Sequence, residues 1–194
     1  MVYLARVKIN PKLCGVSQIK MDPNPVYRAI SRKNLAELKR CFSIEHWEPV
    51  AVVTSMTPLG FATLCGWVEG MRYLILEQKQ DVNRCDRSGR TPIFYAINIE
   101  TIDVLVENGA NVNAQMASTG ATALHEVQDD FWLARSLVHR GADPEMRDAR
   151  GRTAYDCMNT DLVCRVRRGR ENYLEDLAEG RRPFQTHRVP PTKV

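Results

Sequence analysis

Apolar positions along the chain fall into pairs of short segments separated by polar breaks. In residues 86–113 a tight turn leads into Thr91-Pro92 and an apolar segment from Ile93 to Ile97; a polar break, a second apolar segment from Ile102 to Val106 and a glycine stop at Gly109 follow. Threonine suits the N-cap of a helix, proline its first turn and glycine its end. The pattern predicts turn, helix, turn, helix and loop within about thirty residues.

The same phrases recur in the same order along the chain. The threonine that opens each unit lies at positions 57, 91, 122 and 153, at spacings of 34, 31 and 31 residues. One helix pair is too thin to bury its own apolar face, so the copies are expected to stack. Two further phrases recur between the threonines. One is the turns Ser88-Gly89, Thr119-Gly120 and Arg150-Gly151; the other is the loops Asp81-Val82-Asn83, Gly109-Ala110-Asn111-Val112-Asn113 and Gly141-Ala142-Asp143-Pro144.

The unit resembles the ankyrin repeat, whose phrase T-P-L-H-x-A recurs about every 33 residues. T-P-L-G-F-A begins at Thr57 and T-A-L-H-E-V at Thr122. The resemblance extends roughly from Asp22 to Arg168, with Gly60 and Phe94 in place of the histidine. It implies an all-α ankyrin-repeat solenoid of stacked helix-turn-helix units that binds a protein through its concave face and loop tips.

The repeats divide the chain into three parts. Terminal repeats are expected to diverge because one of their faces meets water. The segment from Ser43 to Met56 is longer than the usual connection and is interpreted as an insertion. The predicted parts are an N-terminal arm over 1–21; a repeat domain over 22–168, with a divergent repeat 22–56, repeats 57–90, 91–121 and 122–152 and a capping repeat 153–168; and a short helix (171–179) with a basic, proline-containing tail over 169–194.

Composition indicates a globular chain in a reducing compartment. Of its 194 residues 44% are hydrophobic, and no apolar run approaches the ~18 residues of a membrane span. The six cysteines form no C-x-x-C pair, so we expect free thiols and a cytoplasmic and/or nuclear location. The net charge of +4 comes from residues 165–194, which contain eight Lys/Arg and four Asp/Glu.

No pattern of catalytic or metal-binding residues stands out. The four histidines are scattered over different units, and Cys41 with His46 lacks a second pair of zinc ligands. His125 matches the repeat histidine, which the resemblance implies is a structural group that hydrogen-bonds neighbouring turns. We therefore predict no enzyme, no catalytic residue, no metal and no cofactor. The recurring loop aspartates are interpreted mainly as turn formers and caps: Asp81, Asp86, Asp103, Asp143 and Asp148.

Partner contacts are expected at the loop tips and on the inner helices. Arginine, methionine and aromatic residues are enriched in interfaces, and loop side chains have no core to fill. Phe94 or Tyr95 packing between repeats is the alternative for those two, and Trp132 is interpreted as structural. The predicted contact residues are Arg84, Asp86, Arg87, Arg90, Phe94, Tyr95, Gln115, Met116, Gln128, Asp129, Met146, Arg147 and Arg150.

The predicted partner is a protein of unknown identity, bound by a chain that is otherwise a monomer and has no membrane contact. An inhibitor or adaptor role, including the IκB-like role of some short ankyrin proteins, is an analogy because unrelated binders share the fold. One alternative is a substrate-recruiting subunit of an enzyme complex such as a ubiquitin ligase, docked through residues 171–194. Another is nucleic-acid contact through Arg165 to Arg170, for which a cluster of this length is a weak signal.

Overall fold

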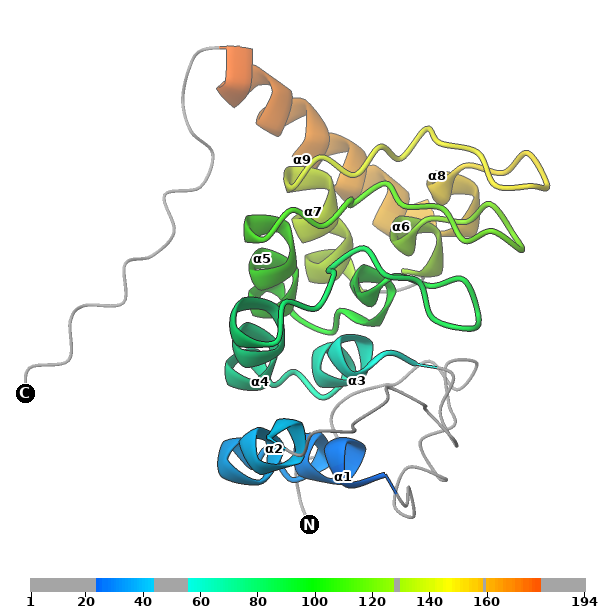
Figure 1. The fold of residues 1–194 in the computed structure, drawn as a ribbon. Helices are drawn as coiled ribbons and strands as arrows, with labels where there is room; N and C mark the ends of the chain where they lie inside the picture. Colours follow the sequence, from blue (N-terminus) through cyan, green and yellow to red (C-terminus); the bar gives the residue numbers. More distant parts are fainter. Residues whose placement is uncertain (1–23, 44–55, 128–129, 159, 179–194) are drawn as a thin grey trace, which may run out of the picture.

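The computed structural model describes residues 24–43, 56–127, 130–158 and 160–178. The predicted arm over 1–21, most of the insertion between Ser43 and Met56, and the tail after residue 178 lie outside this part. The described elements are helical (Figure 1): α1 (Pro25–Ser31), α2 (Leu35–Phe42), α3 (Pro58–Leu64), α4 (Val68–Arg72), η3 (Tyr73–Glu77), η4 (Pro92–Tyr95), α5 (Ile99–Glu107), α6 (Ala123–Glu126), α7 (Phe131–His139), α8 (Ala154–Cys157) and α9 (Thr160–Ala178).

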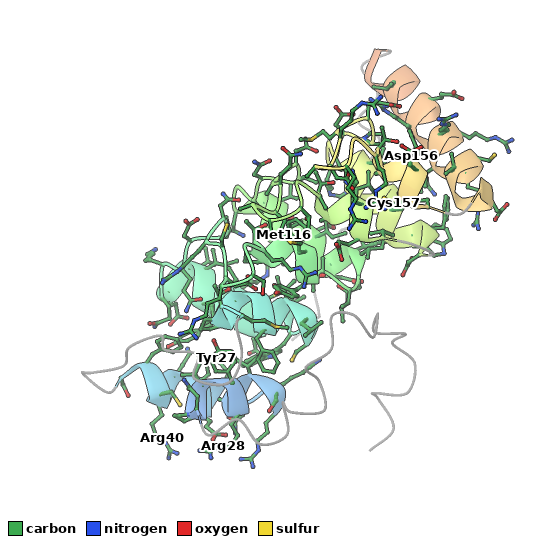
Figure 2. The ribbon with its side chains drawn as sticks, turned by 90° about the vertical axis from the view of Figure 1, so that its right-hand side faces the viewer. Tyr27, Arg28, Arg40, Met116, Asp156 and Cys157 are labelled. Atoms are coloured by element: carbon green, nitrogen blue, oxygen red, sulfur yellow. The ribbon has the colours of Figure 1, made fainter. Side chains whose placement is uncertain are left out.

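The elements form two rows that run the length of the molecule. The inner row is α1, α3, η4, α6 and α8, each packed on the next. The outer row includes α4, α5, α7 and α9, again each packed on the next. Figure 2 shows the resulting elongated stack, with Tyr27 near one end and Asp156 and Cys157 toward the other. The prediction of an all-α array of stacked helix pairs is confirmed.

Side-chain caps fix where the helices begin. Thr57 Oγ1 accepts the backbone N–H of Gly60 at 3.0 Å before α3, and Asn98 Oδ1 accepts that of Thr101 at 2.9 Å before α5. These bonds satisfy donors that the first turn of a helix leaves unpaired. Each unit can therefore start a helix locally, before it packs against its neighbours.

The outer helix of unit 57–90 holds one residue more than the others. The backbone N–H of Gln80 donates to the Leu74 carbonyl, whereas the equivalent bonds in the next two units join Ala110 to Leu105 and Ala142 to Leu137. The extra residue is absorbed in η3, a single π-helical turn, which is how helices accommodate such insertions. Lys79, with φ 52°, takes the left-handed position that glycine fills in the later units.

Three of the inner elements are short, and one of them ends before the apolar segment that predicted it does. The segment from Ile93 to Ile97 is helical only as far as Tyr95, and Ala96 is extended with ψ 132°. Elements η4, α6 and α8 each have four residues, against seven in α3. In the units with a short inner element, the outer helix begins fewer residues after the opening threonine. The apolar side chains that directly follow each threonine are buried in the core.

A continuous core runs through both rows. Met71, Leu74 and Ile75 are buried as predicted, and the core continues through every described unit from Val26 to Val166. Each unit contributes a few large side chains that fill the space beside its neighbour, which is how a thin repeat gains a core. The first described unit turns its basic residues to solvent, as expected of a terminal repeat: Arg28, Arg32, Lys33, Lys39 and Arg40.

The C-terminal helix differs from the prediction. Helix α9 runs without a break from Thr160 to Ala178, so the boundary placed after residue 168 falls inside a helix, and the predicted helix 171–179 is its second half. Glycine inside a helix costs about 1 kcal/mol relative to alanine, and Gly169 does not end this one. The packing of α9 on α7, with Val166 1% exposed, holds the helix through that position.

Candidate functional site

Three loops project on the same side of the stack (Figure 1). We call them the first tip (residues 84–90), the second tip (115–121) and the third tip (146–152). Each is closed by one backbone bond across its neck: Asp86 N–H to the Arg90 carbonyl at 2.9 Å, Met116 N–H to that of Ala121 at 2.8 Å and Asp148 N–H to that of Arg152 at 2.9 Å. The three tips are thus versions of one turn.

Two aspartates hold their own turns together. Asp148 Oδ1 accepts the backbone N–H groups of Arg150 and Arg152, both at 2.9 Å, and its Oδ2 accepts the Arg152 guanidinium at 2.8 and 3.0 Å. Asp86 accepts the N–H groups of Ser88 and Arg90 in the same way. The interpretation of these aspartates as turn formers is confirmed, and it leaves the predicted contact residue Asp86 with a carboxylate committed to its own loop.

The pKa values of the turn carboxylates reflect these bonds. Burial alone would raise the pKa of the Asp148 carboxyl, but the hydrogen bonds from Arg152 and Arg150 outweigh it and hold that pKa below the ordinary value. Backbone and side-chain hydrogen bonds from Thr153 likewise lower the pKa of the Asp156 carboxyl. Both groups are therefore charged in the folded chain near neutral pH.

The tips are also joined to one another. The backbone N–H of Ala149 donates to the Thr119 carbonyl at 2.8 Å, and Gln115 Nε2 donates to the Arg147 carbonyl at 3.0 Å. The first and second tips meet where Gly89 approaches Ala117, closely enough that a Cβ on Gly89 would lie 3.4 Å from the Ala117 nitrogen. The three tips form one continuous surface, which we call the hairpin edge.

Asparagines join the loops that lead into this edge. Asn83 Oδ1 accepts the N–H of Asn111 at 2.7 Å, and its Nδ2 donates to the Gly109 carbonyl at 3.0 Å. Asn113 makes the same pair of bonds one unit later, to Asp143 N–H and the Gly141 carbonyl. Side-chain bonds therefore fix the spacing between adjacent tips and make the edge rigid.

Three predicted contact residues are corrected by the structure. Phe94, Tyr95 and Met116 are 6%, 3% and 5% exposed and belong to the core, so their side chains do not form an accessible binding surface. The short turn of η4 places the two aromatic rings between units, which is the alternative stated for them. Met116 lies under the second tip, at the position that Asp86 and Asp148 take in the others.

Tyr95 is tied to the first tip from below. Its hydroxyl donates to the Asp86 carboxylate. Burial, reinforced by that hydrogen bond and by the Asp86 charge, raises the pKa of Tyr95 far above its ordinary value. Beside this pair, the Arg90 guanidinium lies 3.6 Å from the Glu126 carboxylate of the next unit, with Arg90 Nε buried and without an acceptor among the described residues. Arg90 is therefore half-buried and links two units.

The remaining predicted contact residues divide by exposure. Met146, like Arg90, is half-buried. Gln128 and Asp129 lie outside the described residues, so the structure does not place them. Five predicted residues are exposed on the hairpin edge and form the accessible part of the candidate site: Arg84, Arg87, Gln115, Arg147 and Arg150.

His125 has a structural role. Its Nδ1 lies 2.8 Å from Thr122 Oγ1 and 3.2 Å from the Thr122 nitrogen, and its Nε2 lies 3.1 Å from the Arg152 carbonyl oxygen. The ring is 5% exposed. Both nitrogens thus join the opening of α6 to the third tip, which confirms the interpretation of His125 as a group that bonds neighbouring turns.

The exposed arginine side chains of the hairpin edge are hydrogen-bond donors. Within residues 24–43, 56–127, 130–158 and 160–178, no three His, Cys, Asp or Glu side chains gather as metal ligands would. Five cysteines in this part are free, and burial raises the pKa of the Cys65 thiol to about 11. In the same part of the chain, no helix combines the length and the apolar surface that crossing a bilayer requires.

One exposed aromatic residue was not predicted as such. Trp132, interpreted from the sequence as structural, is 61% exposed at the start of α7, where it packs edge-on against Phe131 and lies 5.9 Å from the Arg135 guanidinium. Helical periodicity gives no signal for this, because the first turn of a helix can project past the units on either side.

Comparison with known proteins identifies the repeat. The family model "Ankyrin repeats (3 copies)" matches residues 26–116. The mouse B-cell lymphoma 3 protein homolog is 33% identical over 121 residues, which is 59% of this chain and 27% of that protein. The human BCL-6 corepressor-like protein 1 is 30% identical over 129 residues, 64% of this chain and 7% of that protein. The chain thus spans about a quarter or less of these relatives.

A solved structure shares the same fold. The crystal structure of the ankyrin repeat domain of Bcl-3, described in its title as a unique member of the IkappaB protein family, matches with a TM-score of 0.62 at 27% identity. The match covers 74% of this chain and 66% of that one.

Proposed function

Because the chain carries ankyrin repeats, a module for contact between proteins, we propose that it binds a partner protein through the hairpin edge and the adjoining inner row. The observation that carries this proposal is the edge itself. Its exposed arginines and glutamine stand on turns that internal hydrogen bonds hold in place. A surface ordered before binding loses little entropy when a partner docks.

An inhibitor or adaptor is the finer role that we favour. Its support is the likeness to the Bcl-3 domain, a member of the IkappaB family by its title, and to a corepressor-like protein. In that role the chain would occupy a surface of its partner without changing it chemically. The role implies a cytoplasmic or nuclear location.

A recruiting subunit is the second candidate. Leu174, in the half of α9 that follows Gly169, is 52% exposed, so this half offers an apolar side chain outside the repeats. Residues 171–194 would then dock the chain onto a larger complex while the hairpin edge holds the substrate.

Nucleic-acid binding through Arg165 to Arg170 is less favoured. The Arg165 guanidinium lies 4.0 Å from the Phe131 ring centroid, and that of Arg167 lies 4.6 Å from the Tyr155 ring centroid. Arg170 is 3.6 Å from Asp143 and 3.8 Å from Glu145. Three arginines of this cluster thus contact groups of the chain itself, which explains their presence without a nucleic acid.

Affinity capture from a native lysate, followed by mass spectrometry, tests the proposal. The baits are the full chain, a truncation after residue 170, an edge variant (Arg84→Ala, Arg87→Ala, Arg150→Ala) and a control variant (Arg32→Ala, Arg40→Ala, Arg168→Ala) at exposed helical or cap positions. A protein lost only with the edge variant is the expected result. Capture unaffected by the edge variant contradicts the proposal; loss only on truncation after residue 170 favours the recruiting subunit, and loss on nuclease treatment favours nucleic acid.

A further inference from the structure

The exposed arginines of this chain differ in whether a carboxylate accompanies them. Several on or beside the helices have one: Arg28 and Arg32 share Glu37, and Arg72 lies 3.7 Å from Glu107. On the hairpin edge, Arg84, Arg87 and Arg150 are exposed, and within the described part of the chain no carboxylate lies within 4 Å of them. The first and third tips therefore present unneutralised guanidinium groups.

The aspartates of the same tips do not cancel this charge. Asp148 is 7% exposed and accepts four hydrogen bonds from its own turn. The carboxylate of Asp86 is engaged by Ser88, Arg90 and Tyr95. The negative charges are thus bound within their own turns, while Arg84, Arg87, Arg147 and Arg150 are exposed to solvent. A turn arranged in this way presents guanidinium groups at its surface, while its own aspartate carboxylate is bound inside the turn.

The second tip separates the two basic ones and is uncharged. It reads Q-M-A-S-T-G-A, and its exposed residues Gln115, Ser118 and Thr119 offer polar side chains. The bond from Ala149 to Thr119 and the contact between Gly89 and Ala117 hold the three tips side by side. Charge along the hairpin edge therefore runs basic, neutral, basic.

We propose that the hairpin edge binds an extended acidic segment of a partner protein, with carboxylates at two points that flank a neutral polar stretch. This assigns a class of partner to the surface in the proposed function and rests on it. Guanidinium groups pair with carboxylates through two parallel hydrogen bonds. Arg84 and Arg87 would receive one acidic point, and Arg147 and Arg150 the other.

Arg147 is already oriented for this contact. Its Nη1 donates to the Gly151 carbonyl at 2.6 Å, which holds the guanidinium against its own turn, while the residue as a whole stays exposed. Fixing the side chain in advance lowers the entropy lost on binding. We therefore expect Arg147 to bind a carboxylate in a defined geometry and not only through long-range attraction between opposite charges.

The composition of the edge favours an acidic peptide over a nucleic acid. The three tips, R-C-D-R-S-G-R, Q-M-A-S-T-G-A and M-R-D-A-R-G-R, contain no aromatic residue. Single-stranded nucleic acids bind on aromatic platforms where bases stack. A charged backbone alone would bind weakly and without register, whereas the order basic, neutral, basic along this edge selects for spacing between carboxylates.

Fluorescence anisotropy of the full chain with a labelled alternating Glu-Gly peptide tests the proposal. The comparison probes are a Gln-Gly peptide and a single-stranded oligonucleotide of equal length. The edge variant is Arg87→Gln with Arg150→Gln, and the control is Arg40→Gln with Arg168→Gln, which removes the same net charge from exposed helix positions. We expect the Glu-Gly peptide to lose about tenfold in affinity with the edge variant and to change less than twofold with the control.

Three results would overturn the proposal. The first is equal affinity for the Glu-Gly and Gln-Gly peptides. The second is an equal loss of affinity for the Glu-Gly peptide in the edge and control variants, which would indicate that net charge alone drives binding. The third is tighter binding of the oligonucleotide than of the Glu-Gly peptide, with that binding abolished in the edge variant. Circular dichroism of both variants confirms that they fold. If the edge variant loses a captured partner while the Glu-Gly peptide does not bind, the acidic segment is wrong and the proposed function stands. If the Glu-Gly peptide does not bind and the edge variant keeps every captured partner, the acidic segment and the proposed function are both wrong.

Discussion

One position, three residues after the threonine that opens each inner element, carries a different residue in each unit. His125 bonds Thr122, Asp156 bonds Thr153 at 2.8 and 2.9 Å, and at Gly60 the backbone bonds Thr57. The fourth is Phe94, which has no polar atom, and Thr91 Oγ1 is buried without a partner among the described residues. A buried hydroxyl without a hydrogen bond costs free energy. The unit with phenylalanine at this position thus has a buried threonine hydroxyl without a hydrogen-bond partner among the described residues.

This difference predicts opposite outcomes for two identical substitutions. Thr91→Val removes an unpaired hydroxyl and should leave the free energy of unfolding unchanged or raise it by up to about 1 kcal/mol. Thr122→Val removes the partner of His125 and should lower it by about 1–3 kcal/mol. Urea unfolding followed by circular dichroism measures both. A larger loss for Thr91→Val than for Thr122→Val would contradict the assignment.

Two helical glycines give a second matched pair. A Cβ at Gly70 would lie 2.1 Å from the ring of Trp67, whose side chain is 5% exposed, whereas a Cβ at Gly169 meets nothing within 4 Å. We expect Gly70→Ala to destabilise the chain by about 1–3 kcal/mol through overpacking. Gly169→Ala should stabilise it by about 0.5–1 kcal/mol through helix propensity.

Thermal unfolding of both variants checks this. A stable Gly70→Ala variant would show that the Trp67 ring can move away without cost.

At the scale of elements, the turns depend on charge. The folded-state pKa values of Asp148 and Asp156 lie below the ordinary value of 3.8. A carboxyl with a lowered folded pKa stabilises the chain above the unfolded pKa, and that contribution disappears as the pH falls through the folded pKa. These two turns should therefore weaken below about pH 4.

The acid dependence can be measured by urea unfolding between pH 7 and pH 3. The double variant Asp148→Asn with Asp156→Asn should be less stable than the unchanged chain at pH 7 and should lose less stability on acidification, because it has two fewer carboxylates to protonate. Asp161→Asn, made at an exposed carboxylate, is the control. Parallel losses in the double variant and the unchanged chain would show that other groups set the acid response.

Helix α9 acts as the cap of the array through its first half. Val166 is buried, and Arg165 and Arg170 contact α7 and the loop before the third tip. We expect truncation after residue 170 to change the midpoint of thermal unfolding by less than about 3 °C, and truncation after residue 158 to lower it by more than about 6 °C. Equal effects of the two truncations would place the capping contacts in the second half.

The order of elements could be predicted from the sequence, and their details could not. Thr57, Thr122 and the recurring turn glycines predict where helices begin and end, because caps are local chemistry. The burial of Phe94, Tyr95 and Met116 depends on how units stack, which a pattern of apolar positions does not describe. Continuation of α9 through Gly169 likewise depends on its packing against α7. Of the candidate site, the exposed arginines Arg84, Arg87 and Arg150 were predictable, and the lack of a carboxylate within 4 Å of them among the described residues was not.

At the scale of the molecule, each unit is stabilised by the units next to it as well as by its own contacts. The inner and outer elements each pack on the next in their row, so central units are supported on both sides and the last unit on one side. Arrays of this kind lose their ends before their centre. Hydrogen exchange should therefore show slower exchange in α5 than in α8 and α9. Uniform protection across the array would instead indicate unfolding as one cooperative unit.

The packing of each element on the next also bears on how the chain acquires its structure. Except for the bond between Tyr95 and Asp86 and the contacts of α9 with α7, α8 and residues 143–145, the side-chain bonds between units join residues 26 to 38 positions apart, as with Asn83 and Asn111 or Gln115 and Arg147. Proteins dominated by contacts close in sequence fold fast, and a growing chain can order its early segments before the later ones exist. The hairpin edge would then be assembled one tip at a time during synthesis, in the order in which it is translated.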